Sequence, residues 1–352
     1  MKTLLRLLLK SQHQKNRSGP AQTDKGMTLV ELLVGSIMAF LIITPMLAFV
    51  VDMLNTDRRE QVKTNTEQDI QAALDFIAQD LSQAIYIYDN NTINKVAPDG
   101  TAGIRDRLPP DGTPILVFWK RQQIRNAVSV NTVNRVPPNR CDENNCNDTY
   151  VRSLVAYYQI KATDPIWCQP SSPPNDCPTR IARFEIREGV RNPDSSDPKQ
   201  PYYKDNEVKK GQEVSPYFNP NFDFDQPRLN VTQNVVGANS PPFDVLVNYI
   251  DHSSLPATVQ KPTGIECQTL LGVTPPAGPG APAFNASDLL ITDDQSHSFY
   301  ACVDTSRNLA RVTIRGNSLR RLQPGNANYD PKKSAFFPTA SVQVQGRGAR
   351  GQ

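Results

Sequence analysis

The most constraining feature of this chain is a run of twenty residues, Leu32–Val51, that contains no charged side chain. At about 1.5 Å per residue, a helix of that length spans about 30 Å, the thickness of the hydrocarbon core of a bilayer. The run therefore predicts one membrane-spanning helix. The carboxylate of Glu31 lies directly before this run, in an apolar stretch where an unpaired charge is energetically costly.

Basic residues gather ahead of the apolar run. Residues 1–26 carry six Lys and Arg against one acid, Asp24. Because basic flanks stay on the cytoplasmic side during insertion, everything after Val51 is expected outside the cytoplasm. Removing the +5 of residues 1–26 from the formal charge of +3 leaves −2 for the rest. The exported part is near neutral, so no nucleic-acid partner is expected.

All six cysteines follow the apolar run. An even number confined to the exported part predicts disulfides in an oxidising compartment. Two of the intervening stretches are rich in Asp, Asn and Pro and do not resemble the C-x2-C of zinc sites, which favours disulfides over metal. The spacing suggests the pairs Cys141 with Cys146, Cys168 with Cys177, and Cys267 with Cys302.

The stretch "KGMTLVELLVG" resembles the processing motif of type IV prepilins and type II secretion pseudopilins. A basic leader ends in Gly26, the apolar Met27 follows, and Glu31 is the fifth residue after the glycine. The resemblance implies that a prepilin peptidase cleaves between Gly26 and Met27 on the cytoplasmic face and methylates the amine of Met27. It also implies that Glu31 binds the N-terminal amine of an adjacent subunit and sets the register of a filament. A charge in apolar surroundings is costly unless it is paired, which gives Glu31 a purpose.

An ordinary single-pass anchor is the alternative interpretation, with Glu31 extending its carboxylate to the lipid headgroups. It leaves Gly26 and the long basic leader unexplained. The prepilin interpretation is therefore favoured.

Residues 55–88 contain no Gly or Pro and predict that the helix of residues 27–54 continues, to about Ala84. This stretch resembles the helix of J-type minor pseudopilins and PilW-like minor pilins, and residues 26–90 are similar to the cyanobacterial pseudopilins of hormogonium polysaccharide secretion. An apolar stripe on one helix face indicates packing against a head domain. The stripe consists of Ile70, Leu74, Ile77, Leu81 and Ile85.

Residues 89–345 predict a β-rich head, and residues 346–352 a disordered tail. Candidate strands are residues 114–120, 150–161, 180–189, 243–251, 298–304, 309–316 and 341–345, all rich in β-branched and aromatic residues. In the third of these, Arg183, Glu185 and Arg187 alternate with apolar residues, which predicts one solvated and one packed face. The expected fold is α+β and pilin-like: a long N-terminal helix, half in the membrane and half amphipathic, packed on an antiparallel sheet with long loops.

Signals for catalysis are sparse. The sequence has no nucleophile-elbow, zinc-protease or phosphate-loop motif and only three histidines, His13, His252 and His297. No catalytic residue, cofactor or metal site is predicted. The acid pairs Asp223/Asp225 and Asp293/Asp294 have calcium-type oxygens without the spacing of an EF-hand loop, so solvated loop acids are the favoured interpretation.

The leading expectation is a minor pseudopilin, a structural and assembly subunit of a type IV pilus-like filament that supports polysaccharide secretion and gliding motility. Its expected partners are the prepilin peptidase, other minor and major pilins or pseudopilins, and the membrane. One alternative is a membrane-anchored glycan-binding module that uses Trp167 and the tyrosines of "PYYKDN", residues 201–206. Another is an anchored hydrolase, for which no nucleophile and base are evident.

Overall fold

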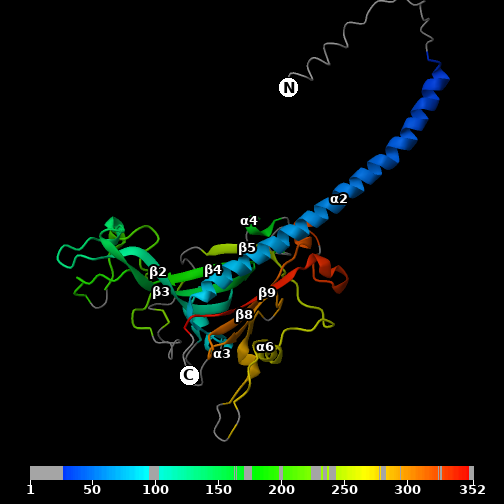
Figure 1. Cartoon of the computed structure of the whole chain (residues 1–352). Coiled ribbons are helices and arrows are strands. Elements are labelled where there is room, and N and C mark those ends of the chain that lie inside the picture. Colours follow the sequence, from blue (N-terminus) through cyan, green and yellow to red (C-terminus); the bar gives the residue numbers. More distant parts are fainter. Residues whose placement is uncertain are drawn as a thin grey trace, which may run out of the picture. The chain divides into compact units, whose positions relative to one another are not determined.

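Helices and two antiparallel sheets make up the described part of the chain, which is α+β as predicted (Figure 1). The computed structural model describes residues 27–94, 103–161, 163, 165–169, 177–197, 201–222, 231–232, 236–237, 243–276, 278, 283–293, 295–323, 325 and 327–348. The predicted leader, residues 1–26 with Gly26, lies outside these ranges. The chain divides into two units, Met1–Arg58 and Arg59–Gln352.

Helix α2 (Leu29–Ser82) continues without interruption through Pro45. It ends where Ser82 donates its hydroxyl to the carbonyl of Gln79. The prediction of helix as far as residue 88 is wrong beyond Ser82, because residues 84–87 form strand β1 (Ala84–Ile87). The reason lies in their sequence, Ala-Ile-Tyr-Ile, whose β-branched and aromatic side chains favour a pleated strand over another helical turn.

The first sheet has five strands in the order β1-β2-β3-β4-β5, every neighbouring pair antiparallel. The long β2–β3 pair carries a bulge between Ile124 and Val128. The strands after β1 are β2 (Thr113–Ser129), β3 (Cys146–Lys161), β4 (Thr179–Arg187) and β5 (Asp244–Ile250).

The second sheet has the order β6-β7-β8-β9 and is also antiparallel throughout. A β-bridge between Ile250 and Gly316 links it to the first sheet. Its strands are β6 (Leu290–Thr292), β7 (Phe299–Asp304), β8 (Leu309–Arg315) and β9 (Thr339–Gln345). All seven predicted strands are confirmed, and β1 and the three-residue β6 were missed.

Short helices connect the strands. The α-helical ones are α3 (Asn90–Asn94), α4 (Pro165–Cys168), α6 (Gly264–Leu271) and α7 (Leu319–Leu322). The 3-10 turns are η1 (Ile104–Arg107), η2 (Pro138–Arg140), η3 (Asp205–Glu207), η4 (Ala286–Leu289) and η5 (Pro331–Phe336).

From residue 59 on, α2 packs along the strands of the second unit (Figure 1). The predicted stripe is buried at Ile70, Leu74, Ile77 and Leu81. Close approach requires Gly316 after β8, since a Cβ there would lie 2.5 Å from Cδ1 of Ile70. The helix therefore rests on both sheets at once.

The opposite face of the first sheet is covered by loops. Trp119 stacks on Phe222, with ring centroids 4.0 Å apart, and meets Phe218 edge-on. Tyr158 meets Phe243 edge-on, with centroids 5.0 Å apart. Part of the long polar run after residue 192 thus supplies aromatic side chains that bury this face.

The prediction of a solvated face on β4 is wrong, because Arg183 is only 7% exposed. Arg183, Glu185 and Arg187 lie on the face covered by α2, where Asp80 of the helix binds Arg183. The predicted disordered tail is also hydrogen-bonded at its start. The amide of Gly346 donates to the carbonyl of Asn308 and that of Gly348 to Ala84, while residues 349–352 lie outside the described ranges.

Candidate functional site

The first turn of α2 holds the residues that the sequence singled out for processing and assembly. Thr28 precedes the helix, and its amide and hydroxyl both donate to Oε2 of Glu31 at 3.1 Å. The amide of Glu31 donates in return to the Thr28 hydroxyl at 3.3 Å. This reciprocal pair is a capping box, which satisfies helix amides that have no partner within the helix.

This capping role was not predicted, although the T-x-x-E pattern before an apolar run signals it. Within the described part of the chain, Oε2 of Glu31 caps the helix and Oε1 makes no hydrogen bond. Met27 directly precedes Thr28, and 71% of its surface is exposed. Gly26, the residue before the expected cleavage, falls outside the described residues.

Every residue from Met27 to Glu60 is exposed, whatever its chemistry. Among the described residues, α2 is the one helix long and apolar enough to cross a membrane, with a mean hydropathy of 2.4 over its best window and none of that window buried. The hydroxyls of Ser36 and Thr44 donate hydrogen bonds to the backbone carbonyls of Leu33 and Phe40, respectively, both at 2.8 Å. Between Leu32 and Val51 the uncharged exterior with its internally bonded hydroxyls suits lipid or other apolar helices.

A buried cluster of charges lies where α2 meets the first sheet. Asp80 accepts from Nζ of Lys120 at 2.9 Å, from Nε of Arg183 at 2.8 Å and from the hydroxyl of Tyr157 at 2.8 Å. Glu185 binds Nη1 of Arg183 at 2.8 Å and lies 3.8 Å from Nζ of Lys120. The helix thus contacts β2, β3 and β4 through one carboxylate.

The ionisation of this cluster follows from its pairing. Burial alone would raise the pKa of Asp80, but the charges of Arg183 and Lys120 outweigh burial and lower it. The same balance brings the pKa of Glu185 to about 2. Burial, together with the charge of Asp80, raises the pKa of the Tyr157 hydroxyl well above its usual value, so this group acts as a donor. The cluster is therefore two anions held by cations.

The six cysteines form the three pairs that the spacing suggested. Disulfides join Cys141 to Cys146, Cys168 to Cys177, and Cys267 to Cys302. The first two close short loops, and the third ties α6 to β7.

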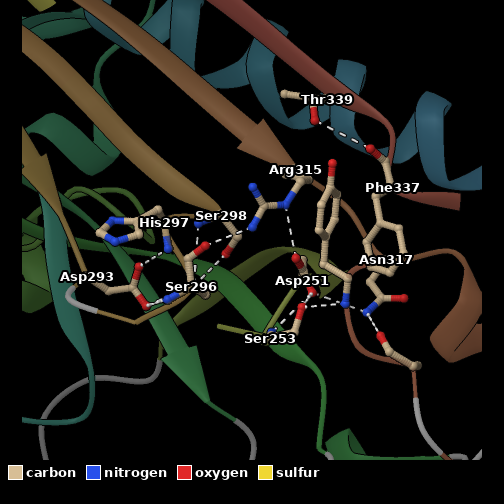
Figure 2. A network of polar contacts seen from close by, with 12 residues as sticks. Asp251, Ser253, Asp293, Ser296, His297, Ser298, Arg315, Asn317, Phe337 and Thr339 are labelled. Carbon is tan, nitrogen blue, oxygen red and sulfur yellow. Dashed lines mark hydrogen bonds and ion pairs between the residues drawn. The ribbon is translucent and has the colours of Figure 1, made fainter. Parts of the chain in front are cut away.

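Asp293, a calcium candidate, belongs to a network that closes the loop before β7 (Figure 2). Its carboxylate accepts from the amide and hydroxyl of Ser296 and from the amide of His297, at 2.7–3.0 Å. Nδ1 of the His297 ring lies 3.1 Å from the hydroxyl of Thr292. These bonds build a turn, and no group of three metal-binding side chains occurs among the residues that the structure describes. Asp223, Asp225 and Asp294 fall outside them.

A second part of the network holds the two sheets together. The fully buried Asp251 accepts from Nε of Arg315 at 3.0 Å and from Ser253, and Asn317 contacts it at 3.3 Å (Figure 2). His252, the neighbouring histidine, lies 3.1 Å from Nη2 of Arg320. Both histidines of the head are thus engaged in structural contacts.

The aromatic residues proposed for glycan stacking are packed into the head. Tyr203 is only 8% exposed. Tyr202 meets Phe218 edge-on, and Trp167 covers the Cys168–Cys177 disulfide with the guanidinium of Arg180 5.0 Å from its ring centre. The described structure does not support a stacking surface at these positions.

Comparison with protein-family models, curated proteins and solved structures found no match to this chain.

The buried charge of Asp80 gives a stability prediction. Asp80→Asn keeps the size of the side chain but leaves Lys120 and Arg183 short of a counter-charge, which should lower the free energy of unfolding by about 3–5 kcal/mol. Chemical denaturation of the detergent-solubilised chain, followed by near-UV circular dichroism, measures the loss. Asp75→Asn on the exposed side of α2 is the matched control and should change it by less than about 0.5 kcal/mol. Equal effects of the two variants would contradict the prediction.

The same cluster predicts an acid-dependent loss of stability. A carboxylate whose pKa is lowered by folding stabilises the protein above its usual pKa, which is 3.8 for Asp80 and 4.5 for Glu185, and this contribution is lost as the pH falls toward about 2. The stability difference between the natural chain and Asp80→Asn should therefore be full at pH 7 and should shrink below pH 3.8. Denaturation curves at a series of pH values test this, and a difference that stays constant would contradict it.

Proposed function

We propose that the chain is a minor pseudopilin, a structural and assembly subunit of a type IV pilus-like filament. The observation that carries the proposal is the position of Glu31. It follows the Gly26–Met27 motif at prepilin spacing and lies in the first turn of a helix whose next twenty residues, Leu32–Val51, expose only an apolar or neutral surface. That helix then becomes amphipathic and packs on antiparallel sheets, an arrangement compatible with a pilin-like layout.

In this proposal the prepilin peptidase removes residues 1–26 and methylates the amine of Met27. Before cleavage, the N-terminus is cytoplasmic, residues 27–54 cross the plasma membrane and the head lies outside the cytoplasm. The disulfides of the head are consistent with an oxidising compartment. Afterwards the apolar helix exchanges lipid for the helices of other pilins or pseudopilins.

Glu31 has two tasks in the proposed filament. Oε2 caps its own helix through Thr28, and Oε1 accepts from the methylated amine of Met27 in a neighbouring subunit. A carboxylate in a medium of low dielectric constant is costly without a cation, so the pairing favours one axial position of the neighbour.

By resemblance to the cyanobacterial pseudopilins of hormogonium polysaccharide secretion, the filament serves polysaccharide export and gliding motility. The subunit contributes to assembly of the filament and does not itself act on the polysaccharide.

The first test concerns cleavage. Gly26→Phe should block entry of the backbone into the peptidase and leave a membrane-bound chain that still begins at Met1. Intact mass and N-terminal peptide analysis of the protein from its native membranes measure this. Gly35→Ala is the control, because a Cβ at Gly35 meets no atom within 4 Å and processing should proceed. A natural chain that begins at Met1, or a Gly26→Phe chain that begins at Met27, would refute the proposal.

A second test separates the two tasks of Glu31. Glu31→Gln keeps an acceptor for Thr28 but removes the charge, so the chain should be cleaved yet fall at least about tenfold in the sheared filament fraction. Thr28→Val removes the capping hydroxyl and leaves the charge, and its filament fraction should remain within about twofold of the natural level because the cap contributes only about 1 kcal/mol. The reverse order would mean that Glu31 acts only as a helix cap.

A further inference from the structure

An open groove of about 650 Å³ lies on the head, beside the start of β3 and the segment after β4. Its apolar lining includes Ile85, Val128 and Pro193, and its rim carries arginines and a tyrosine. The volume falls in the range of about 300–1,000 Å³ that is typical of ligand sites. None of the residues used in the proposed filament contact lines it.

One buried carboxylate, that of Glu188, forms ion pairs with two of the arginines. Glu188 accepts from Nε and Nη2 of Arg152, both at 2.9 Å, and lies 3.7 Å from Nε of Arg191. The side chain of Glu188 is 5% exposed, whereas that of Arg191 is 61% exposed. Because the bidentate pair with Arg152 occupies Glu188, the largely exposed Arg191 keeps hydrogen-bond donors for a ligand.

A third arginine lines the groove without an acidic partner among the described residues. The guanidinium of Arg121 lies 3.9 Å from the ring centre of Tyr150, which is itself 53% exposed. Stacking on an aromatic face holds a guanidinium flat and leaves its N–H edge available for a carboxylate. Three arginines thus face one carboxylate, and the groove carries excess positive charge.

We propose that this groove binds an acidic saccharide chain. Arg121 and Arg191 bind its carboxylates, and the C–H face of a sugar ring packs against Val128 and the ring of Tyr150. Cations beside an apolar wall distinguish such a ligand from a small anion, which needs no apolar contact, and from a neutral glycan, which needs no arginine pair. The inference holds whether or not the chain assembles into a filament.

The test uses the full chain in detergent micelles and an oligogalacturonate as the acidic probe, with its methyl ester as the neutral probe. Isothermal titration calorimetry should detect the acid and not the ester. The double variant Arg121→Gln/Arg191→Gln should weaken binding by at least about tenfold, and Tyr150→Leu by about threefold or more. Arg125→Gln, an exposed arginine of the same strand outside the groove, is the matched control and should bind normally.

Equal binding of acid and ester, full binding by the double variant, or no binding at millimolar probe would each overturn the proposal. Displacement of the probe by an equimolar amount of sulfate would also overturn it, because the groove would then be a simple anion site. Thermal unfolding checks that each variant is folded. If the double variant is not folded, Arg191→Gln alone, at an arginine whose side chain is 61% exposed, gives the same decision.

Discussion

The pairing of Asp80 with three strands is the constraint on which the arrangement of the head depends. Apolar side chains alone would let α2 slide or rotate on the sheets, because Ile70, Leu74, Ile77 and Leu81 are alike in shape and repeat at helical spacing. Asp80 has one position that satisfies Lys120, Tyr157 and Arg183 together. A shift by one turn would bury an unpaired acid and two unpaired cations, which is far costlier than a lost methyl contact.

Such a cluster provides specificity more than stability. Apolar residues of equal volume would be as stable in many proteins, since the desolvation of paired charges offsets their attraction. What the charges add is a single register between the helix and the meander of β2, β3 and β4. The Arg315–Asp251 pair then holds the second sheet to the first, and Gly316 lets that sheet approach Ile70 of the same helix. Polar contacts thus position the first sheet relative to α2 and the second sheet relative to the first, and their partners are far apart in the sequence.

Local patterns explain what the sequence could predict. Period-2 runs located seven strands, and the apolar stripe located the buried face of α2, because each signal lies within a few neighbouring residues. The helix end at Ser82 was missed because the absence of Gly and Pro outweighed the β-branched run of residues 84–87. The face of β4 was assigned to solvent because alternation shows two faces but not which one a helix covers. Its counter-charge, Asp80, lies 103 residues earlier.

The same distinction applies to the candidate site. Glu31 was found from its spacing to Gly26, and the cap from Thr28 could have been found too, since both lie within one turn. Under the proposed function, however, its environment depends on partners outside the chain. After the proposed cleavage, an ammonium at Met27 would lie at the positive end of its own helix dipole, where a cation is disfavoured and where Glu31 already offsets that dipole. Under the proposed function, cleavage therefore produces a cation that is disfavoured at its own helix terminus. Oε1 of Glu31 can accept a hydrogen bond from the same cation of a neighbouring subunit. Neighbouring subunits resolve both at once, and a chain that had not been cleaved would lack the cation that makes the contact favourable.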